Sequence, residues 1–500
     1  MCARDRWLSV PHAGVRTRKG LVRTVRRAVQ ALRDRRAAWR PAIGSAAAGL
    51  VLAAGAVALT GPWDAGQRTA ERDHADAAEA QRDHAEAERA VGTVPAAAPV
   101  LPPLDGAGTP LSPAAVERAL APLLADPALG EGAAGAVVDI ATGTALYASD
   151  AGEGRAPAST VKTLTAVAAL DALGPDHRLT TEAVWDAERE RVVLVGGGDT
   201  TLTRDDLRGL ARRTARALAE RDVEAAGVAY DISRYPREQH HPIGEGNSNI
   251  ATITPLQLNA GRTDGSASGP APRTPDPAAE AAAVFAGLLA DEGIRGGDGR
   301  PGRQTAPEDA QRLAVHRSAP LSVLVERMLT HSDNDLAEAV ARTVAVDAGQ
   351  PADFRGVDRA LTARLDALGL PLDGVRLADA SGLDRDGRVS AALLTRALAL
   401  AADPQRPELR PALTGLPVAG FTGTLAGRYD GEGGGAGGGA GLVRAKTGTL
   451  TGVNALAGTA VTADGRVLAF AFLASDTREP AAAEAALDAA ATRLATCGCR

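Results

Sequence analysis

Lysine is almost missing from this chain of 500 residues. Lysine and arginine together number 55, yet the only lysines are Lys19, Lys162 and Lys446. On a surface, arginine replaces lysine at little cost. A guanidinium, however, stays protonated at any ordinary pH, whereas a buried lysine can lose its proton. The positions that keep lysine are therefore candidates for a site that needs a titratable amine.

Aromatic residues and cysteines are also scarce. Aromatics make up 3% of the chain and hydrophobic residues 45%, so a core has to be built mainly from Ala, Val and Leu. The three cysteines are Cys2, Cys497 and Cys499. Two thiols near the C-terminus do not make a metal site, and they either form a small disulfide or stay reduced. We expect no metal and no cofactor.

Charge of both signs is present but unevenly distributed. The net charge is -6, yet residues 1–40 hold twelve basic and two acidic residues, which leaves about -16 on the rest. An acidic body argues against nucleic-acid binding. Residues 41–63 carry no charge and are long enough to span a bilayer. We predict a basic cytoplasmic segment, then a membrane anchor with the rest outside the membrane, or a cleaved signal peptide and a secreted product.

The remaining pattern predicts an α+β fold. Residues 64–110 are polar and then rich in Pro and Ala, which is typical of a stalk and a linker. After them, helices alternate with short apolar runs, which predict an antiparallel sheet covered by helices. The expected strands are 134–140, 145–148, 442–447, 454–461 and 467–473, and the expected flanking helices are 112–124 and 480–496.

Two of the three lysines lie in short motifs with hydroxyl side chains. Ser159 and Lys162 are three residues apart at a predicted helix start, so they share one face. A serine becomes a nucleophile when a base takes its proton, and a buried lysine can supply that base. Lys446 begins Lys-Thr-Gly-Thr, in which Gly448 leaves room for a close backbone approach. Each motif also has a plainer interpretation, such as an edge strand with a surface lysine.

A third motif, Ser332-Asp333-Asn334, lies between two predicted helices. These residue types are also ordinary helix N-caps. The three motifs together favour a catalytic site over an ordinary helix cap. They occur in the order Ser-x-x-Lys, Ser-x-Asn, Lys-Thr-Gly, which is the order in serine acyl-transfer enzymes that act on D-Ala-D-Ala peptides and β-lactams.

With these motifs the chain resembles the serine D-alanyl-D-alanine carboxypeptidase/endopeptidases, the class C low-molecular-mass penicillin-binding proteins. Three further segments resemble the same family. They are Gly196–Thr200, Tyr230-Asp231 and Asp379–Arg385. The resemblance implies a β-lactamase/transpeptidase-like domain in two parts, 111–180 and 308–500. Between its first and second motifs it implies an inserted domain, 181–307.

The resemblance also implies a role for each motif residue. Ser159 is then the nucleophile, Lys162 its base, Ser332 and Lys446 a proton relay, Asn334 a ligand of the substrate amide, and Thr447, Gly448 and Thr449 the carboxylate-binding strand. Arg385 and Tyr230 are expected to contact the stem peptide, and the backbone N–H groups of Ser159 and Thr449 to form an oxyanion hole. The implied substrate is a peptidoglycan peptide and the implied inhibitors are β-lactams.

Two alternatives stay open at this stage. A β-lactamase shares the acylation residues but also needs a group that activates water for deacylation. A cell-wall-binding protein could keep the fold without the catalysis, although an arginine-rich chain that retains lysine at both motifs argues against this. None of the eight histidines lies within a motif, which disfavours a Ser-His-Asp hydrolase.

Overall fold

The computed structural model describes residues 111–499 apart from 132, 297–298 and 430–435. The predicted basic segment (1–40), anchor (41–63) and stalk with linker (64–110) lie outside the described residues. Among the described helices, none is both long and apolar enough to cross a bilayer. All described residues belong to one compact unit, Pro102–Arg500.

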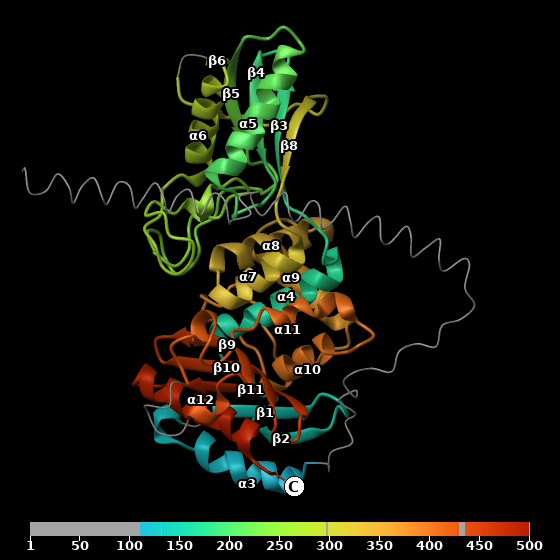
Figure 1. Cartoon of the computed structure of the whole chain (residues 1–500), viewed down its shortest axis with the longest axis vertical. Coiled ribbons are helices and arrows are strands. Elements are labelled where there is room, and N and C mark those ends of the chain that lie inside the picture. The colour runs from blue at the N-terminus through green and yellow to red at the C-terminus, as the bar shows by residue number, and fades with distance from the viewer. Residues whose placement is uncertain (1–110, 132, 297–298, 430–435, 500) are drawn as a thin grey trace, which may run out of the picture. The chain divides into compact units, whose positions relative to one another are not determined.

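Five strands from the two ends of the described chain form one antiparallel sheet (Figure 1). In spatial order they are β2 (Ala145–Ser149), β1 (Ala133–Asp139), β11 (Val467–Ser475), β10 (Val453–Val461) and β9 (Val443–Leu450). Strand β1 pairs with β11, with Val137 opposite Phe470. The predicted strands are confirmed to within a few residues, and β9 lies at one edge of the sheet.

Helices cover both faces of this sheet. On one face lie α3 (Pro113–Leu124) and α12 (Pro480–Thr496), and on the other α4 (Lys162–Leu173), α7 (Leu321–His331), α8 (Asn334–Asp347), α9 (Phe354–Ala367), α10 (Ala391–Ala401) and α11 (Pro411–Thr414). Strand β11 alternates accordingly. Phe470 and Phe472 pack toward α3 and α12, while Ala469 and Ala471 pack toward the larger helical group. That larger cluster consists of Ala, Val, Leu and a single Met, as the shortage of aromatics predicts.

Short 3-10 turns connect these elements. They are η1 (Pro127–Leu129), η2 (Ala158–Val161), η3 (Asn259–Gly261), η4 (Pro407–Leu409), η5 (Gly423–Leu425) and η6 (Ala436–Gly439). At the C-terminus, Cys497 and Cys499 form a disulfide, the first of the two states that the sequence leaves open. The Cys499 carbonyl accepts a hydrogen bond from Ser112 N (2.9 Å), which ties the end of the chain to the start of α3.

A second sheet occupies the segment between the first two motifs. Its strands are β3 (Thr180–Asp186), β4 (Arg191–Gly196), β5 (Ala225–Asp231), β6 (Arg295–Gly296), β7 (Gly302–Arg303) and β8 (Gln311–Arg317). Helices α5 (Arg204–Ala219) and α6 (Pro277–Asp291) pack on one face. Because β8 pairs with β3, this sheet continues past residue 307, where the sequence places the end of the inserted domain. Those domain bounds stay a prediction.

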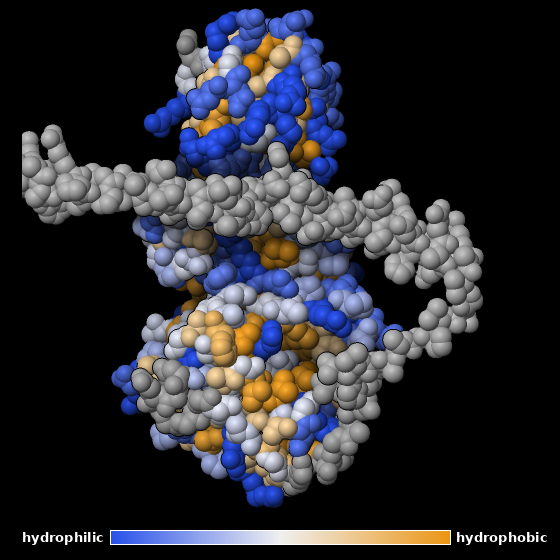
Figure 2. Space-filling model, viewed as in Figure 1, coloured by the Kyte–Doolittle hydropathy of each residue, from blue (hydrophilic) through white to orange (hydrophobic). Residues whose placement is uncertain are grey.

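The face of this second part that is visible in Figure 2 is mostly hydrophilic. Figure 2 shows polar side chains over most of its visible face, around α5. Helix α5 begins with a capping box, in which Thr203 and Asp206 each bond the other's backbone N–H. Its apolar residues face the sheet and its arginines face outward, so the helix is stabilised by packing on one side only.

Candidate active site

The three motifs, far apart in sequence, meet at one cleft of about 420 Å³. Ser159 comes from η2, Ser332 from the turn after α7, Asn334 from the first position of α8, and Thr447 and Thr449 from edge strand β9. All five side chains line the cleft. Since the edge of β9 is open beside them, an extended peptide can lie along this strand.

Lys162 lies beneath the cleft with no exposed surface. Its Nζ is 2.9 Å from Ser159 Oγ, 2.7 Å from Asn334 Oδ1 and 2.5 Å from the Ser381 carbonyl oxygen. Asn334 Nδ2 donates to the Asn249 carbonyl (3.0 Å), which fixes the amide so that its oxygen faces the lysine. Lys162 therefore has three polar neighbours in a closed setting.

These neighbours determine which way a proton can move. An amide oxygen and a carbonyl oxygen only accept hydrogen bonds, so Asn334 and Ser381 engage two N–H groups of Lys162. When Lys162 is a neutral amine, its lone pair is then left for the third neighbour, the hydroxyl of Ser159. This is the geometry a general base needs, because the nucleophile lies within hydrogen-bond reach.

The surroundings of Lys162 lower its pKa, so the neutral amine is populated near neutral pH. Burial lowers the pKa of Lys162 to about 8, although the nearby carboxylates of Asp379 and Asp333 oppose the shift. Burial and the proximity of Lys162 also lower the pKa of Lys446 well below its usual range. An arginine could not respond in this way at either position.

The rate of acylation is therefore expected to rise with pH. Below pH 8 the unprotonated fraction of Lys162 grows about tenfold per pH unit, and above its pKa it levels off. The second-order rate of acylation by a fluorescent penicillin, measured from pH 6 to 9.5, should follow this curve. A rate that is flat or falls across that range contradicts the role of a neutral lysine.

Lys446 and Ser332 form a second lysine–serine pair across the cleft. Lys446 is fully buried, and its Nζ lies 2.9 Å from Ser332 Oγ and 2.8 Å from the Thr447 carbonyl. Ser332 ends α7 in a left-handed conformation (φ 56°), which is unusual for a residue other than glycine. Asp333 caps the next helix by accepting from Leu336 N (3.0 Å). The turn thus serves as a helix cap and also presents Ser332 to the cleft.

The backbone around Ser159 is held by close contacts. Ala158 has a positive φ of 45°, a strained conformation that persists only where the surroundings impose it. Gly382 packs so tightly that an added Cβ would lie 1.8 Å from the Ala158 carbonyl oxygen. At Gly448 a Cβ would lie 2.8 Å from the Pro157 carbonyl oxygen. Gly448 is therefore required for packing against η2, a role that its motif alone does not reveal.

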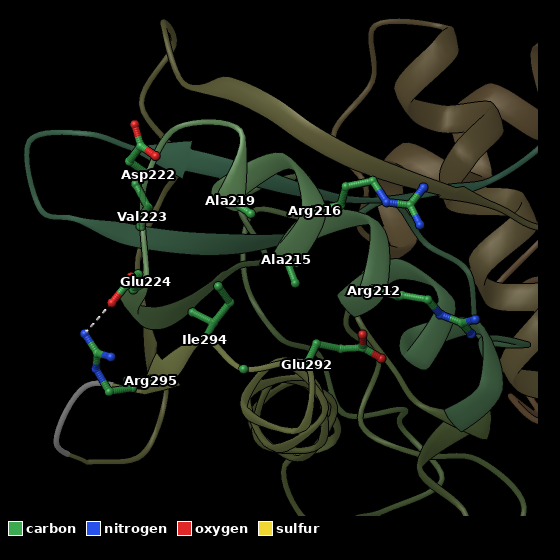
Figure 3. A pocket seen from close by; sticks show the side chains of 11 residues that line it. Arg212, Ala215, Arg216, Ala219, Asp222, Val223, Glu224, Glu292, Ile294 and Arg295 are labelled. Atoms are coloured by element: carbon green, nitrogen blue, oxygen red, sulfur yellow. Dashed lines mark hydrogen bonds and ion pairs between the residues drawn. The ribbon is translucent and has the colours of Figure 1, made fainter.

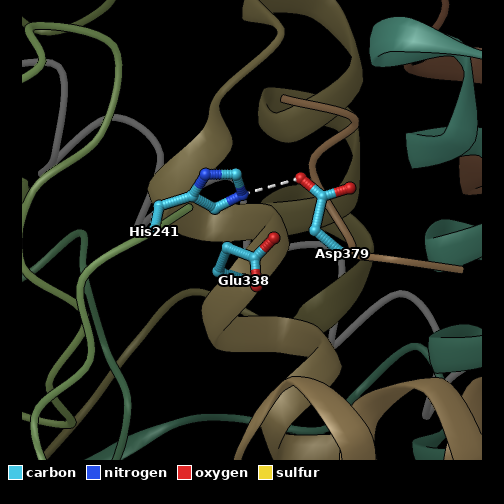
Figure 4. Close-up of side chains that lie close together, drawn as sticks. All are labelled: His241, Glu338 and Asp379. Atoms are coloured by element: carbon cyan, nitrogen blue, oxygen red, sulfur yellow. Dashed lines mark hydrogen bonds and ion pairs between the residues drawn. The ribbon is translucent and has the colours of Figure 1, made fainter. Parts of the chain in front are cut away.

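A buried network behind Lys162 fixes the carbonyl that binds it. Ser381 Oγ donates to Asp379 Oδ2 (2.5 Å), and Ser381 N donates to Glu338 Oε1 (3.0 Å). His241 Nε2 lies 2.9 Å from the same Asp379 oxygen, as Figure 4 shows. Because Ile243 N donates to His241 Nδ1 (3.1 Å), the ring proton is on Nε2. His241 thus links the segment between β5 and α6 to the ligands of Lys162.

The same three groups could suggest a metal site. The ligand atoms of His241, Glu338 and Asp379 lie within 4.8 Å of one another. Backbone N–H groups of residues 380–384, however, already point at the carboxylate oxygens, and Arg342 is paired with Glu338 at 2.5 Å. These oxygens are committed as hydrogen-bond acceptors, so we assign the cluster a structural role.

Five of the predicted site residues line the cleft, Lys162 and Lys446 bond two of these, and Gly448 lies between Thr447 and Thr449. The remaining two, Tyr230 and Arg385, do not reach it. Tyr230 lies in β5, is 7% exposed and packs in the core of the second sheet. Its neighbour Asp231 accepts hydrogen bonds from Ser233 N (2.7 Å) and Ala306 N (2.7 Å). The Tyr-Asp pair therefore stabilises the end of β5. Arg385 is exposed on a turn and does not line the cleft. The structure therefore gives no support to a contact between either residue and the stem peptide.

Several lining residues were not predicted from the sequence. They are Asn249, Arg262, Gly269, Pro270, His331, Asp333, Leu383, Thr424, Arg428 and Glu484. Arg262 and Asn249 come from the inserted segment, Arg428 precedes β9, and Glu484 lies in α12. His331 and Asp333 adjoin Ser332 in the chain, and Leu383 lies in the segment Asp379–Arg385. The local sequence does not mark the others, because they reach the cleft through tertiary packing.

A larger cavity lies elsewhere, between α5, the turn that leads into β5 and the segment that follows α6. It has a volume of about 530 Å³ and includes Arg212, Arg216, Glu292 and Arg295 (Figure 3). Arg295 is paired with Glu224 (3.3 Å). None of the motif residues lines this cavity, so it provides no nucleophile from them.

Comparison with known proteins points to one family. The sequence profile of the D-Ala-D-Ala carboxypeptidase 3 (S13) family matches residues 116–271 and 263–494. A carboxypeptidase of Mycobacterium tuberculosis is 36% identical over 80% of this chain and 87% of its own length. Carboxypeptidase DacB of Mycolicibacterium smegmatis is 35% identical over 85% of this chain and 92% of its own length.

The fold also matches a solved structure. Penicillin binding protein 4 (dacB) from Haemophilus influenzae aligns with a TM-score of 0.59 and 21% identity, covering 76% of this chain and 98% of its own. At that identity the likeness concerns the fold, and it supports the transpeptidase-like architecture that the motifs predict.

Proposed function

The chain belongs to the D-Ala-D-Ala carboxypeptidase 3 (S13) family, and we propose that it cleaves the terminal D-Ala-D-Ala bond of peptidoglycan stem peptides through an acyl-enzyme on Ser159. One observation carries the proposal. The Nζ of fully buried Lys162 lies 2.9 Å from Ser159 Oγ, while two pure acceptors engage its N–H groups.

The reaction begins at the pair of Ser159 and Lys162. Lys162 takes the hydroxyl proton as Ser159 Oγ attacks the carbonyl carbon of the penultimate D-Ala. The backbone N–H groups of Ser159 and Thr449 are proposed to stabilise the negative charge on the carbonyl oxygen. The carbon–nitrogen bond then breaks, and Ser332 with Lys446 delivers a proton to the departing amine. Water hydrolyses the ester and regenerates the serine.

Binding of the substrate is assigned to the strand and to the turn. Thr447 and Thr449 line the cleft on β9 and offer hydroxyls to the carboxylate of the leaving residue. Asn334, whose amide orientation is fixed by Asn249, lines the cleft and is proposed to bond the peptide amide of the substrate. A β-lactam places its strained carbonyl at the same point and acylates Ser159 in the same way.

Release of D-Ala tests the proposal directly. The purified full chain, incubated with an N-acylated L-Lys-D-Ala-D-Ala peptide, should release D-Ala, and prior incubation with benzylpenicillin should stop that release. A folded chain that releases no D-Ala and leaves benzylpenicillin intact contradicts the proposal. Rapid turnover of benzylpenicillin without D-Ala release would instead support the β-lactamase alternative.

We also propose that the enzyme acts outside the cytoplasm, held by a membrane anchor at residues 41–63. The support is the uncharged run itself, which follows a strongly basic segment. Alkaline extraction of membranes from cells that produce the full chain should leave it in the membrane fraction. Recovery of the uncleaved chain in the extract would contradict the anchor.

A further inference from the structure

Residues 239–253, a stretch of the inserted segment between β5 and α6, contact both groups that hold Lys162. The first group is the amide of Asn334, whose oxygen engages Lys162 and whose Nδ2 donates to the Asn249 carbonyl (3.0 Å). The second group is the carbonyl of Ser381. The inserted segment thus lies next to the base of the reaction, although Lys162 itself belongs to the other part of the fold.

His241 reaches the Ser381 carbonyl through Asp379. His241 Nε2 donates to Asp379 Oδ2 (2.9 Å), and the Ser381 hydroxyl donates to the same oxygen (2.5 Å). The backbone N–H of Gly382 donates to the other oxygen of Asp379 (2.9 Å). Asp379 therefore binds Ser381 and the residue after it, and a shift of this carboxylate moves the carbonyl that engages Lys162.

The His241 ring is held in one orientation. Its side chain has no exposed surface, and its Nδ1 accepts a hydrogen bond from Ile243 N (3.1 Å). It also meets the Phe354 ring edge to face, with the two centroids 5.5 Å apart. The stretch that carries it is closed by two backbone hydrogen bonds between Gln239 and Ile253 (3.1 and 2.8 Å). The ring N–H is therefore offered from a fixed point, and His241 does not line the cleft.

We propose that His241 is a positioning residue: through Asp379 it holds the carbonyl that engages Lys162, so that the inserted segment takes part in forming the active site. The inference rests on the proposed function, because it concerns the base that activates Ser159. If the Ser381 carbonyl is displaced, the neutral amine keeps one acceptor instead of two and can turn its lone pair away from the serine hydroxyl. Loss of the His241 contact should therefore slow the chemical step and leave ligand binding unchanged.

The test replaces His241 by two amides of different length. Glutamine places its NH₂ near the position of the ring Nε2 and can still donate to Asp379, whereas asparagine is too short to reach it. Acylation of the full chain by a fluorescent penicillin is followed over a range of concentrations, which separates the limiting rate from the dissociation constant.

His241→Asn should lower the limiting rate of acylation roughly tenfold at an unchanged dissociation constant. A shift of about 1 Å at a reacting group can cost roughly 10²-fold, and Asn334 still holds the amine in this variant. His241→Gln should restore most of the lost rate. A purely structural role would instead lower the melting temperature of a variant without changing the limiting rate of its folded fraction.

His240→Asn is the matched control, because His240 is the neighbouring residue, half of its side chain is exposed and it does not line the cleft. It should be acylated at the wild-type rate. A folded His241→Asn with the wild-type limiting rate overturns the inference. An equal loss in His241→Asn and His241→Gln overturns it as well, and so does a change confined to the dissociation constant.

Ser381→Ala tests the same contact from the other side of Asp379, should the His241 variants not fold. It removes the hydroxyl that donates to Asp379 and keeps the carbonyl that engages Lys162. It should also lower the limiting rate at an unchanged dissociation constant, and an unchanged limiting rate overturns the inference. If the folded wild-type chain is not acylated at all, the proposed function fails. Wild-type acylation that no variant changes defeats only the inference.

Discussion

Lys162→Arg is expected to abolish acylation of Ser159, with a loss of about 10³-fold or more in the rate of penicillin labelling. The guanidinium keeps its proton, so it cannot accept one from the serine. It is also larger and planar, in a site with no exposed surface. The measurement is the second-order rate of labelling of the full chain, compared between wild type and variant.

A control has to separate lost chemistry from lost folding. Lys19→Arg makes the same exchange outside the motifs and should label at the wild-type rate. The melting temperature of Lys162→Arg, followed by circular dichroism, shows whether the fold survives. A folded variant that labels at more than about a tenth of the wild-type rate contradicts the proton-accepting role of Lys162.

Gly382→Ala is expected to have the second-largest effect, although Gly382 contacts no substrate. Its added Cβ would lie 1.8 Å from the carbonyl oxygen of Ala158, the residue before the nucleophile. Either that backbone or the segment that carries Ser381 has to move. Because a displacement of about 1 Å at a reacting group can cost roughly 10²-fold in rate, we expect a loss of that order in acylation.

Gly374→Ala separates this clash from ordinary backbone strain. Gly374 also has a positive φ, 69° against 82° for Gly382, but its Cβ would meet nothing within 4 Å. Alanine at this positive φ should lower stability by about 1 kcal/mol and leave acylation unchanged. Equal labelling rates in the two variants would show that the contact with Ala158 does not position Ser159.

Much of the site could be read from the sequence because its chemistry is local. Ser159 and Lys162 lie within one helical turn, and Thr447 and Thr449 lie two residues apart on one strand, so spacing alone puts the members of each pair on the same face. The scarcity of lysine made both motifs conspicuous. Ser332-Asp333-Asn334 was harder to interpret, because Asp333 is indeed a helix cap while its two neighbours face the cleft.

Other parts could not be predicted because they depend on contacts between distant segments. His241 and Asp379 meet across 138 residues, and the sequence near His241 carries no sign of this contact. A role of Tyr230 in binding finds no support in the structure, because the Tyr-Asp pair lies at the end of a strand and stabilises the second sheet. Glu484 lies on an alanine-rich helix that the sequence predicts, but only the packing of α12 against β9 brings it to Thr449.

The most direct test of this account is to locate the covalent adduct. The full chain is treated with benzylpenicillin, digested with trypsin and analysed by tandem mass spectrometry. We expect one penicilloyl group on the peptide Ala156–Lys162, in which Ser159 is the only serine. A penicilloyl group on Ser332 or Ser381 instead, or an unmodified folded chain beside intact penicillin, would contradict the claim that Ser159 is the nucleophile.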